Sequence, residues 1–378
     1  MTDAPPLAGI VAVELGQSVA APFVCQLLAD LGALVIKVEK PGGDDARAWG
    51  PPFIDGAAAT FQALNRGKRS VVCDLRDPAQ HALLTRLVLE RADVVLQNMR
   101  PGQVDSLGLG AEALCARKPS LVYCNIGAFG RRGPLAERPG YDPLMQAFGG
   151  IMSVTGEPGR PPVRVGPSIV DIGTGLWAAI GIVLALYRRA SSGAGGVVDV
   201  SLFETAAAWM GPFALQFLAS GTLPGKQGTG QAGIVPYRAY ATADGHVVVA
   251  AGNNELYRRF CTALAHPEWI DDPRFATNPD RVASAAHLDA LVEPVMAGRP
   301  NAAWGSIFDA AGVPCAPVQD VGQLLAHEQV GALGLLASLP GLSQPVMGPA
   351  LSLDDERPFA QTAPPALGET TIEALLAG

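Results

Sequence analysis

A single carboxylate stands directly before a long apolar run. Asp171 lies in the stretch VRVGPSIVDIGTGLWAAIGIVLALYRR, residues 163–189, and no charged side chain follows it between Ile172 and Tyr187. Such a carboxylate can cap a helix by accepting backbone N–H bonds at its start. It can also be a nucleophile or general base held at the mouth of a buried helix. The local pattern fits both roles, so the rest of the chain has to decide between them.

Basic side chains gather where the expected strands of the first 126 residues end. In an open α/β sheet, ligands bind beyond the carboxyl ends of the strands. Those ends lead here into GQSVAAP (16–22), EKPGGDDAR (39–47), CDLRDP (73–78), QNMRPG (97–102) and NIGAFGRRG (125–133). The cations in or beside these loops are Lys40, Arg47, Arg69, Arg76 and Arg100. Each could be an ordinary solvated charge, but their shared edge predicts a phosphorylated, nucleotide-like ligand.

The elements that carry these loops alternate between strands and helices. Continuous apolar strands are predicted over 9–16, 33–39, 70–75, 93–98 and 121–126. Helices are predicted from Pro22 to Gly32, from Pro78 to Arg91 and around 111–117. This alternation is typical of a parallel sheet covered on both faces, so the predicted fold class is α/β.

The second half of the chain has a different organisation. The apolar run after Asp171 is predicted to be a buried helix, and residues 196–220 a strand that leads into a further helix. The Gly-rich segment 221–233 is the best domain boundary. A hairpin across 237–251, helices to about Ala311 and a Pro-punctuated link over 311–318 are expected after it.

Composition excludes several classes of protein. With 378 residues, 49% hydrophobic and 16% charged, the chain can bury a large core, and its formal charge of −8 argues against a nucleic-acid partner. The N-terminus lacks the pattern of a signal peptide, and the uncharged run is short for a bilayer crossing, so we predict a cytoplasmic protein without a membrane partner. Six cysteines without a C-x-x-C pair and five scattered histidines predict reduced thiols and no metal site.

One motif invites a dinucleotide interpretation that its context does not support. Gly228, Gly230 and Gly233 in GTGQAG match G-x-G-x-x-G. A dinucleotide fingerprint must follow a strand and open a helix, whereas this one follows a Pro-containing loop and leads into the strand-like IVPYRAY. A mobile Gly-rich lid or a plain linker fits the segment better.

Many segments in fixed order resemble the family III CoA-transferases, which include formyl-CoA and carnitine CoA-transferases and are related to the α-methylacyl-CoA racemases. The resemblance runs from about Leu7 to LGETT at 367–371. The segments that carry it are VELGQSVAAPFVCQLLADLGALVIKVEKPGGDDAR, LNRGKRSVVCDL, NMRPG, GYDPLMQAFGG, SVTGEPGRPPVRVGPSIVDIGTG, VVDVSLFET and AAGVPCAPV.

The resemblance implies a role for each residue that matches a family motif. Asp171 matches the nucleophilic aspartate, and Gln17 and Tyr141 match residues that line the acyl site. Gly228 and Gly230 resemble the glycine loop that closes over the intermediate. The positions that match CoA contacts are Ser18, Lys40, Cys73, Asp74, Leu75, Arg76, Asn98, Met99, Arg100 and Asp142.

The resemblance also implies an architecture and a reaction. The expected fold is a Rossmann-like parallel-sheet large domain plus a smaller α+β domain, in an interlinked homodimer. On this plan residues 1–220 begin the large CoA-binding domain, 221–318 form the small domain with the Gly-rich loop, and 319–378 return to the large domain. Acyl-CoA and a free carboxylic acid would be the substrates, with no permanently bound cofactor.

The opening carboxylate then acquires a chemical purpose. Attack by Asp171 on an acyl thioester would give a mixed acyl-aspartyl anhydride and CoA thiolate. The helix start would hold its charge through backbone N–H groups and the positive end of the dipole. Gly173 and Gly175 would let the backbone approach the ligand.

Some positions depart from the family pattern and leave alternatives open. Ser106 stands where many members have a basic residue, and the Gly-rich loop is shorter than in formyl-CoA transferases, which argues against formyl-CoA and oxalate as the substrate pair. The related racemases use a His where this chain has Tyr141, a poor base with an ordinary pKa near 10, which favours transfer over racemisation. A non-catalytic CoA-binding protein is the more distant alternative. Arg164 could read a second carboxylate, as in a C4–C5 dicarboxylate, or be an exposed structural arginine.

Overall fold

A computed structural model describes residues 4–377 of the chain as two compact units. The first unit contains the chain up to Ile151, the segment Arg164–Gly221 and the chain from Glu328 onwards. The second contains Met152–Val163 and Thr222–His327. Each unit has its own hydrophobic core.

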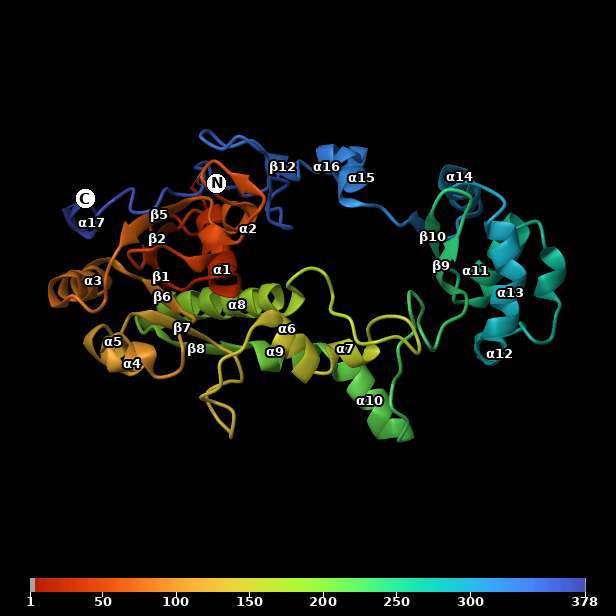
Figure 1. The fold of residues 1–378 in the computed structure, drawn as a ribbon, viewed down its shortest axis with the longest axis horizontal. Coiled ribbons are helices and arrows are strands. Elements are labelled where there is room, and N and C mark those ends of the chain that lie inside the picture. The colour runs from red at the N-terminus through yellow and green to blue at the C-terminus, as the bar shows by residue number, and fades with distance from the viewer. Residues whose placement is uncertain (1–3, 378) are drawn as a thin grey trace. The chain divides into compact units, whose positions relative to one another are not determined.

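A six-stranded parallel sheet forms the centre of the first unit (Figure 1). Its strands, in spatial order, are β5 (Lys68–Val72), β2 (Leu34–Glu39), β1 (Val11–Leu15), β6 (Val94–Gln97), β7 (Val122–Gly127) and β8 (Gly196–Ser201). Neighbours along this order pair in parallel throughout, which confirms the predicted parallel sheet. The third expected strand ends early, at Val72, so that Cys73 to Arg76 lie in the following loop.

Helices cover both faces of this sheet because its strands alternate apolar residues between two cores. Ala12 of β1 faces a core built with α1 (Ala20–Asp30) and α8 (Ile169–Ser192). Val13, its neighbour, faces a second core built with α3 (Pro78–Arg91), α5 (Ala111–Arg117) and α17 (Ile372–Ala377).

Shorter elements complete the first unit. Those between the sheet strands are η1 (Asp45–Ala48), β3 (Phe53–Ile54), β4 (Ala57–Ala58), α2 (Ala59–Leu64), α4 (Gln103–Ser106) and α6 (Asp142–Phe148), and those directly after β8 are α9 (Leu202–Trp209) and α10 (Gly211–Ser220). Those near the C-terminus are α16 (Glu328–Ala332), β12 (Leu336–Ala337) and β13 (Val346–Met347). Thr370 bridges to Val71 of β5, so the end of the chain lies along the edge strand of the sheet.

Helix α8, which contains Asp171 in its first turn, is buried on one face only. Its buried side packs on the sheet and on α1, as expected, but the other side exposes large apolar residues. These are Leu176, Trp177, Ile180, Val183, Leu184 and Tyr187. By length and composition alone α8 could cross a membrane, and 39% of its most apolar window is buried. The prediction of a buried helix therefore holds for one face of α8 and is wrong for the other.

Two glycines of α8 serve close packing rather than ligand access. A Cβ on Gly173 would lie 2.2 Å from Trp209, and one on Gly175 would lie 2.7 Å from Phe23. The expectation that these glycines let the backbone approach a ligand is therefore wrong. They let α8 pack against α9 and α1 instead.

The second unit is a small α+β structure. Three antiparallel strands lie in the order β11 (Cys315–Pro317), β10 (His246–Ala250) and β9 (Tyr237–Ala241), and the β9–β10 pair confirms the predicted hairpin. Helices pack around an aromatic core that contains Trp304 and Phe308. The remaining elements of this unit are α7 (Ile151–Val154, which begins at the boundary), α11 (Asn254–Ala263), η2 (Pro267–Ile270), α12 (Asn278–Ala283), α13 (Ala285–Met296), α14 (Asn301–Ala311) and α15 (Val321–Ala326).

Candidate functional site

A cavity of about 810 Å³ opens at the carboxyl edge of the first unit's sheet. Its walls come from the loops after β1, β2, β5, β6 and β7, together with residues 138–143 and the start of α8. This volume lies within the range of small-molecule sites. A cavity therefore lies at the sheet edge where the sequence predicts a ligand.

The structure brings most of the predicted site residues together in this cavity. Those that line it are Gln17, Ser18, Lys40, Cys73, Asp74, Leu75, Arg76, Asn98, Met99, Arg100, Tyr141, Asp142 and Asp171. Gly228 and Gly230 do not line it and belong to the second unit. There, the Gly228 N–H donates to the carbonyl of Gly156 at 3.0 Å, which ties the Gly-rich segment to residues of its own unit.

Asp171 lies in the first turn of α8 but does not cap it. Ser168 is the N-cap residue, and its side chain accepts no capping bond. The carboxylate of Asp142, in α6, takes this role by accepting the N–H groups of Val170 at 2.8 Å and Asp171 at 3.2 Å. The N-cap interpretation of Asp171 is therefore wrong, because its own backbone N–H needs a cap and receives it from another helix.

Asp142 is a fully engaged carboxylate. It is 2% exposed, and its second oxygen accepts a 2.6 Å hydrogen bond from the Gln146 side chain. The Gln146 amide also accepts the Val165 N–H at 2.8 Å, so the same pair fixes the chain that leads into α8. Asp142 reaches the cavity wall, but its hydrogen bonds show that it orients the start of α8.

Asp171 is electrostatically different from Asp142. Burial, and then the negative charge of Asp142, raise the pKa of the Asp171 carboxyl from 3.8 to about 7. Within residues 4–377, no hydrogen bond to its carboxylate oxygens is present. A lining carboxylate with raised basicity and free oxygens is suited to act as a nucleophile or a base.

Two neutral polar residues share the cavity with Asp171. Gln17 is exposed and follows β1, where the Asn98 side chain holds both its N–H (2.9 Å) and its C=O (2.8 Å). Tyr141 is 62% exposed and precedes α6. An amide and a phenol on fixed backbones can donate hydrogen bonds to an oxyanion that develops near Asp171.

The cations predicted at the sheet edge divide into two groups. Lys40, Arg76 and Arg100 line the cavity. Arg47 instead makes a bidentate pair with Glu39 at 2.8 and 2.7 Å, and Arg69 lies 3.8 Å from Glu369. The shared-edge prediction is thus wrong for these two, because neither of them lines the cavity. Lys40 and Arg76 also pair with carboxylates, those of Asp45 and Asp74, but both line the cavity.

One basic residue of the cavity was not among the predicted site residues. Arg138 lines the wall three residues before Tyr141, and its guanidinium lies 5.9 Å from the Phe129 ring centroid. Its place beside the GYDP segment was the available signal. Arg164, the candidate for a second carboxylate, is exposed and is absent from the residues that line this cavity.

Metal chemistry finds no ligand set in the part of the chain that the structure describes. Among residues 4–377, no group of three or more His, Cys, Asp or Glu side chains is arranged to hold an ion. All six cysteines are free, and Cys73, which reaches the cavity, has its thiol pKa raised to about 11 by burial and by Asp74 and Asp77. That thiol is a weak nucleophile at neutral pH.

Comparisons with known proteins agree with this site. A family model described as CoA-transferase family III matches residues 7–371. The chain is 38% identical to succinate–glutarate CoA-transferase of Agrobacterium fabrum, over 99% of this chain and 97% of that one. It is 34% identical to human succinyl-CoA:glutarate CoA-transferase (99% and 86%) and 36% identical to acetyl-CoA:oxalate CoA-transferase of Acetobacter aceti (90% and 87%). These names do not favour the racemase alternative.

A solved structure has the same fold. The crystal structure of a CAIB/BAIF family protein from Brucella suis superimposes with a TM-score of 0.90 at 41% identity and covers 99% of both chains. The likeness extends over both units and includes the cavity-lining segments of the first.

Proposed function

Because the chain belongs to CoA-transferase family III, we propose that it moves CoA from an acyl-CoA thioester to a free carboxylic acid through covalent intermediates on Asp171. The observation that carries this proposal is the state of Asp171. Its carboxylate lines the cavity, has raised basicity and accepts no hydrogen bond from the described residues. Nucleophilic catalysis requires such a group.

The proposed reaction breaks one thioester and forms another in four steps, without loss of an activated acyl group to water. An Asp171 oxygen attacks the acyl carbonyl and the C–S bond breaks. CoA thiolate departs, and a mixed acyl-aspartyl anhydride forms. The thiolate then attacks the Asp171 carbonyl, which releases the first acid and forms an aspartyl-CoA thioester. The acceptor carboxylate attacks the aspartyl-CoA carbonyl and expels the thiolate, which gives a second mixed anhydride. The thiolate finally attacks the acceptor carbonyl of this anhydride, which forms the new acyl-CoA and releases the Asp171 carboxylate. Gln17 and Tyr141 donate hydrogen bonds to the oxyanions that form.

We place the substrates among C4–C5 dicarboxylic acids. Several relatives carry succinate, glutarate, D-citramalate or mesaconate in their names. A second carboxylate needs a cation, and Arg138 offers one in the cavity wall close in sequence to Tyr141. Arg164 offers none there, so we transfer the proposed carboxylate-reading role from Arg164 to Arg138.

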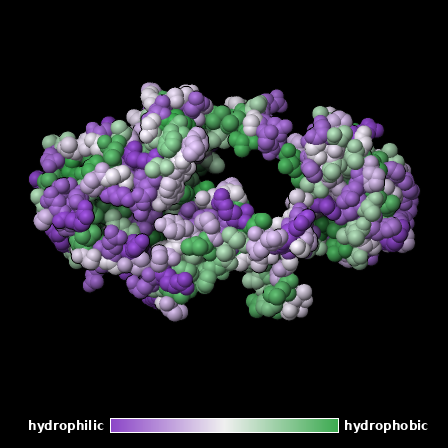
Figure 2. All heavy atoms as spheres, viewed as in Figure 1, coloured by the Kyte–Doolittle hydropathy of each residue, from purple (hydrophilic) through white to green (hydrophobic). Residues whose placement is uncertain are grey.

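We also propose that two copies of the chain associate. The exposed apolar face of α8 and the whole of α10, which buries no residue, leave large hydrophobic side chains in water. Figure 2 shows hydrophobic residues gathered over α10, at the bottom of the view. Monomeric proteins rarely expose patches of this kind, and a second copy that covers them would remove the cost.

Hydroxylamine trapping tests the covalent step directly. The anhydride and the aspartyl-CoA thioester are both electrophilic at the Asp171 carbonyl. With succinyl-CoA present, hydroxylamine should convert Asp171 to a hydroxamate, seen by mass spectrometry on the peptide that contains SIVDIGTG. Free CoA alone is the control and should give no modification. An active enzyme whose Asp171 peptide remains unmodified would refute the proposal.

A substrate screen tests the acid class. The protein is incubated with succinyl-CoA and a pool of free mono- and dicarboxylic acids, and new CoA thioesters are identified by mass spectrometry. Thioesters of C4–C5 dicarboxylates are expected to dominate. Equal formation of monocarboxylic thioesters, or an unchanged product pattern for Arg138→Ala, would contradict the assignment.

A further inference from the structure

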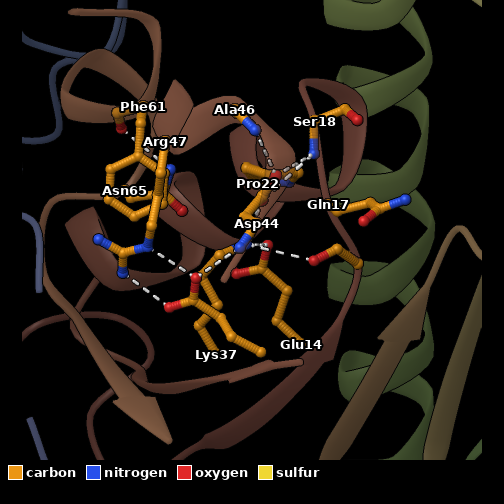
Figure 3. A network of polar contacts seen from close by, with 12 residues as sticks. Glu14, Gln17, Ser18, Pro22, Lys37, Asp44, Ala46, Arg47, Phe61 and Asn65 are labelled. Atoms are coloured by element: carbon orange, nitrogen blue, oxygen red, sulfur yellow. Dashed lines mark hydrogen bonds and ion pairs between the residues drawn. The ribbon is translucent and has the colours of Figure 1, made fainter. Parts of the chain in front are cut away.

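Four charged side chains are buried together beneath the Gln17–Ser18 loop. They are Glu14 of β1, Lys37 of β2, Asp44 before η1 and Lys68 of β5, and each side chain is at most 1% exposed. Lys37 Nζ lies 3.0 Å from Glu14 Oε1 and 2.8 Å from Asp44 Oδ2 (Figure 3). Lys68 Nζ lies 2.8 Å from the other Glu14 oxygen. The two positive and two negative charges balance.

Lys37 connects this buried cluster to the backbone before Gln17. Its ammonium also donates to the carbonyl of Gly16 at 3.2 Å. Burial opposes its charge, but the Glu14 and Asp44 carboxylates raise the pKa of Lys37 well above its usual value, so the ammonium stays charged. The Lys37 ammonium thus holds both the Gly16 carbonyl, directly before Gln17, and the Asp44 carboxylate.

Asp44 holds the backbone after Gln17. Its two oxygens lie 3.1 and 3.2 Å from the Ser18 nitrogen, whose N–H donates to them, and one also accepts the Ala46 N–H at 2.9 Å. Ser18 has φ of +74°, a conformation that residues with a side chain rarely adopt. Such a residue persists only where its surroundings over-determine it.

Every backbone polar group that brackets Gln17 is therefore held by a side chain. Lys37 donates to the Gly16 carbonyl, and Asn98 binds the N–H and C=O of Gln17 itself. Asp44 accepts the N–H of Ser18. The Gln17 side chain itself lines the cavity. Figure 3 shows Asp44 between Lys37 and Ser18, with Gln17 beside them.

We propose that Lys37 is a positioning residue for the acyl site, acting through Gly16 and Asp44 to fix the backbone from which the Gln17 amide projects. The inference rests on the proposed function, because it takes the Gln17 amide as the group that acts on the acyl oxyanion. Four charges buried for stability alone have no advantage over well-packed apolar residues. A fixed loop geometry is what this arrangement supplies, and catalysis is sensitive to displacements of about 1 Å.

The test compares Lys37→Met with a matched substitution, Arg66→Met, that also removes a buried cation. Arg66 is also a buried cation of the first unit, paired with Asp30 and 2% exposed, but its side chain donates to Asp30 and the Met347 carbonyl and not to the loop around Gln17. Both Lys37→Met and Arg66→Met should lower the unfolding temperature. Only Lys37→Met should lower kcat, by about ten- to a hundredfold, with KM for acyl-CoA unchanged.

A double-mutant cycle shows whether Lys37 acts through Gln17. In a Gln17→Ala background there is no amide to position, so Lys37→Met should change kcat less than about twofold. A full loss in both backgrounds, or equal kcat losses for Lys37→Met and Arg66→Met, would overturn the inference. If Gln17→Ala alone leaves kcat unchanged, the proposed acyl site fails instead.

Amide hydrogen exchange provides a readout independent of activity. In Lys37→Met, the peptide that spans 16–20 should exchange at least about tenfold faster than in the wild type, while a β7 peptide stays unchanged. If Lys37→Met does not fold, Asp44→Asn serves the same purpose, because Asn keeps one acceptor but loses the charge that pairs with Lys37. Unchanged exchange at 16–20 in the folded variant refutes the positioning role.

Discussion

Replacing Asp171 by Asn should stabilise the protein while it abolishes transfer. The native state keeps a proton on Asp171 up to a pKa of about 7, whereas the unfolded chain loses it near 3.8. Between these values the folded state binds more protons, so the stability contributed by Asp171 falls as pH rises and its full penalty is present above pH 7. Asn carries no charge and avoids this penalty.

The size of the effect follows from the same two values. A pKa raised from 3.8 to about 7 corresponds to about 4 kcal/mol of destabilisation at pH 8. Water reaches this carboxylate through the open cavity, so we expect a gain of about 2 kcal/mol for Asp171→Asn at pH 8. The gain should be smaller at pH 5 than at pH 8, because only the part of the interval between the unfolded and native pKa values that lies below pH 5 then contributes.

Thermal unfolding of the two proteins from pH 5 to pH 8 measures this difference. The variant should unfold a few degrees higher at pH 8, bind CoA and form no new thioester. A residue that capped α8 would behave differently, since Asn caps as well as Asp and the variant would remain active with unchanged stability. An Asp171→Asn variant less stable than the wild type at pH 8 would refute the electrostatic reasoning.

Three further predictions concern the same unit. Arg100→Ala and Lys40→Ala should each raise KM for acyl-CoA about ten- to a hundredfold with a smaller effect on kcat. Arg69 does not line the cavity, so Arg69→Ala should leave KM unchanged. Equal effects of the three substitutions on KM would contradict the cavity assignment. The value of kcat/KM, which reports on the free enzyme, should rise with pH through about 7 as Asp171 ionises. Asp142→Asn retains an acceptor for the start of α8 but removes a negative charge, so it should move this rise to lower pH. A rise at the same pH in the variant would show that the charge of Asp142 does not affect the pKa of Asp171. Light scattering should find no folded monomer at nanomolar concentration, and Leu184→Glu on the exposed face of α8 should impair assembly if that face is the interface.

The sheet was predictable because its strands carry an unbroken local signal. Apolar residues predominate in most of the strands, and helices separate them, so a parallel sheet follows from the chain alone. The cavity followed in turn, because parallel strands present their carboxyl ends at one edge. The buried charge cluster beneath the Gln17–Ser18 loop was not predicted. Glu14 and Lys37 interrupt two apolar strands, and only the β1–β2 register, which places them side by side, shows that they are partners.

The cap of α8 could not be read from the sequence for a related reason. Asp142 and Val170 are 28 residues apart, and nothing local distinguishes an aspartate that caps its own helix from one that caps another. Both Asp171, before an apolar run, and Asp142, before Pro143, have the local pattern of a residue that caps its own helix. The exposed face of α8 was equally hidden, because apolar composition does not tell a core helix from one that presents a face to another chain.

Asp142 of α6 affects the chemistry of Asp171 as well as capping the start of α8. We expected backbone N–H groups to hold the charge of Asp171, but Asp142 occupies those of Val170 and Asp171, and its negative charge adds to the burial that raises the Asp171 pKa. A carboxylate of ordinary pKa near 4 is a poor match for a thiolate leaving group whose conjugate acid has a pKa near 8.5. A pKa of about 7 narrows that gap and makes attack on the thioester less unfavourable. The residue that caps the helix therefore also prepares its neighbour for the chemistry.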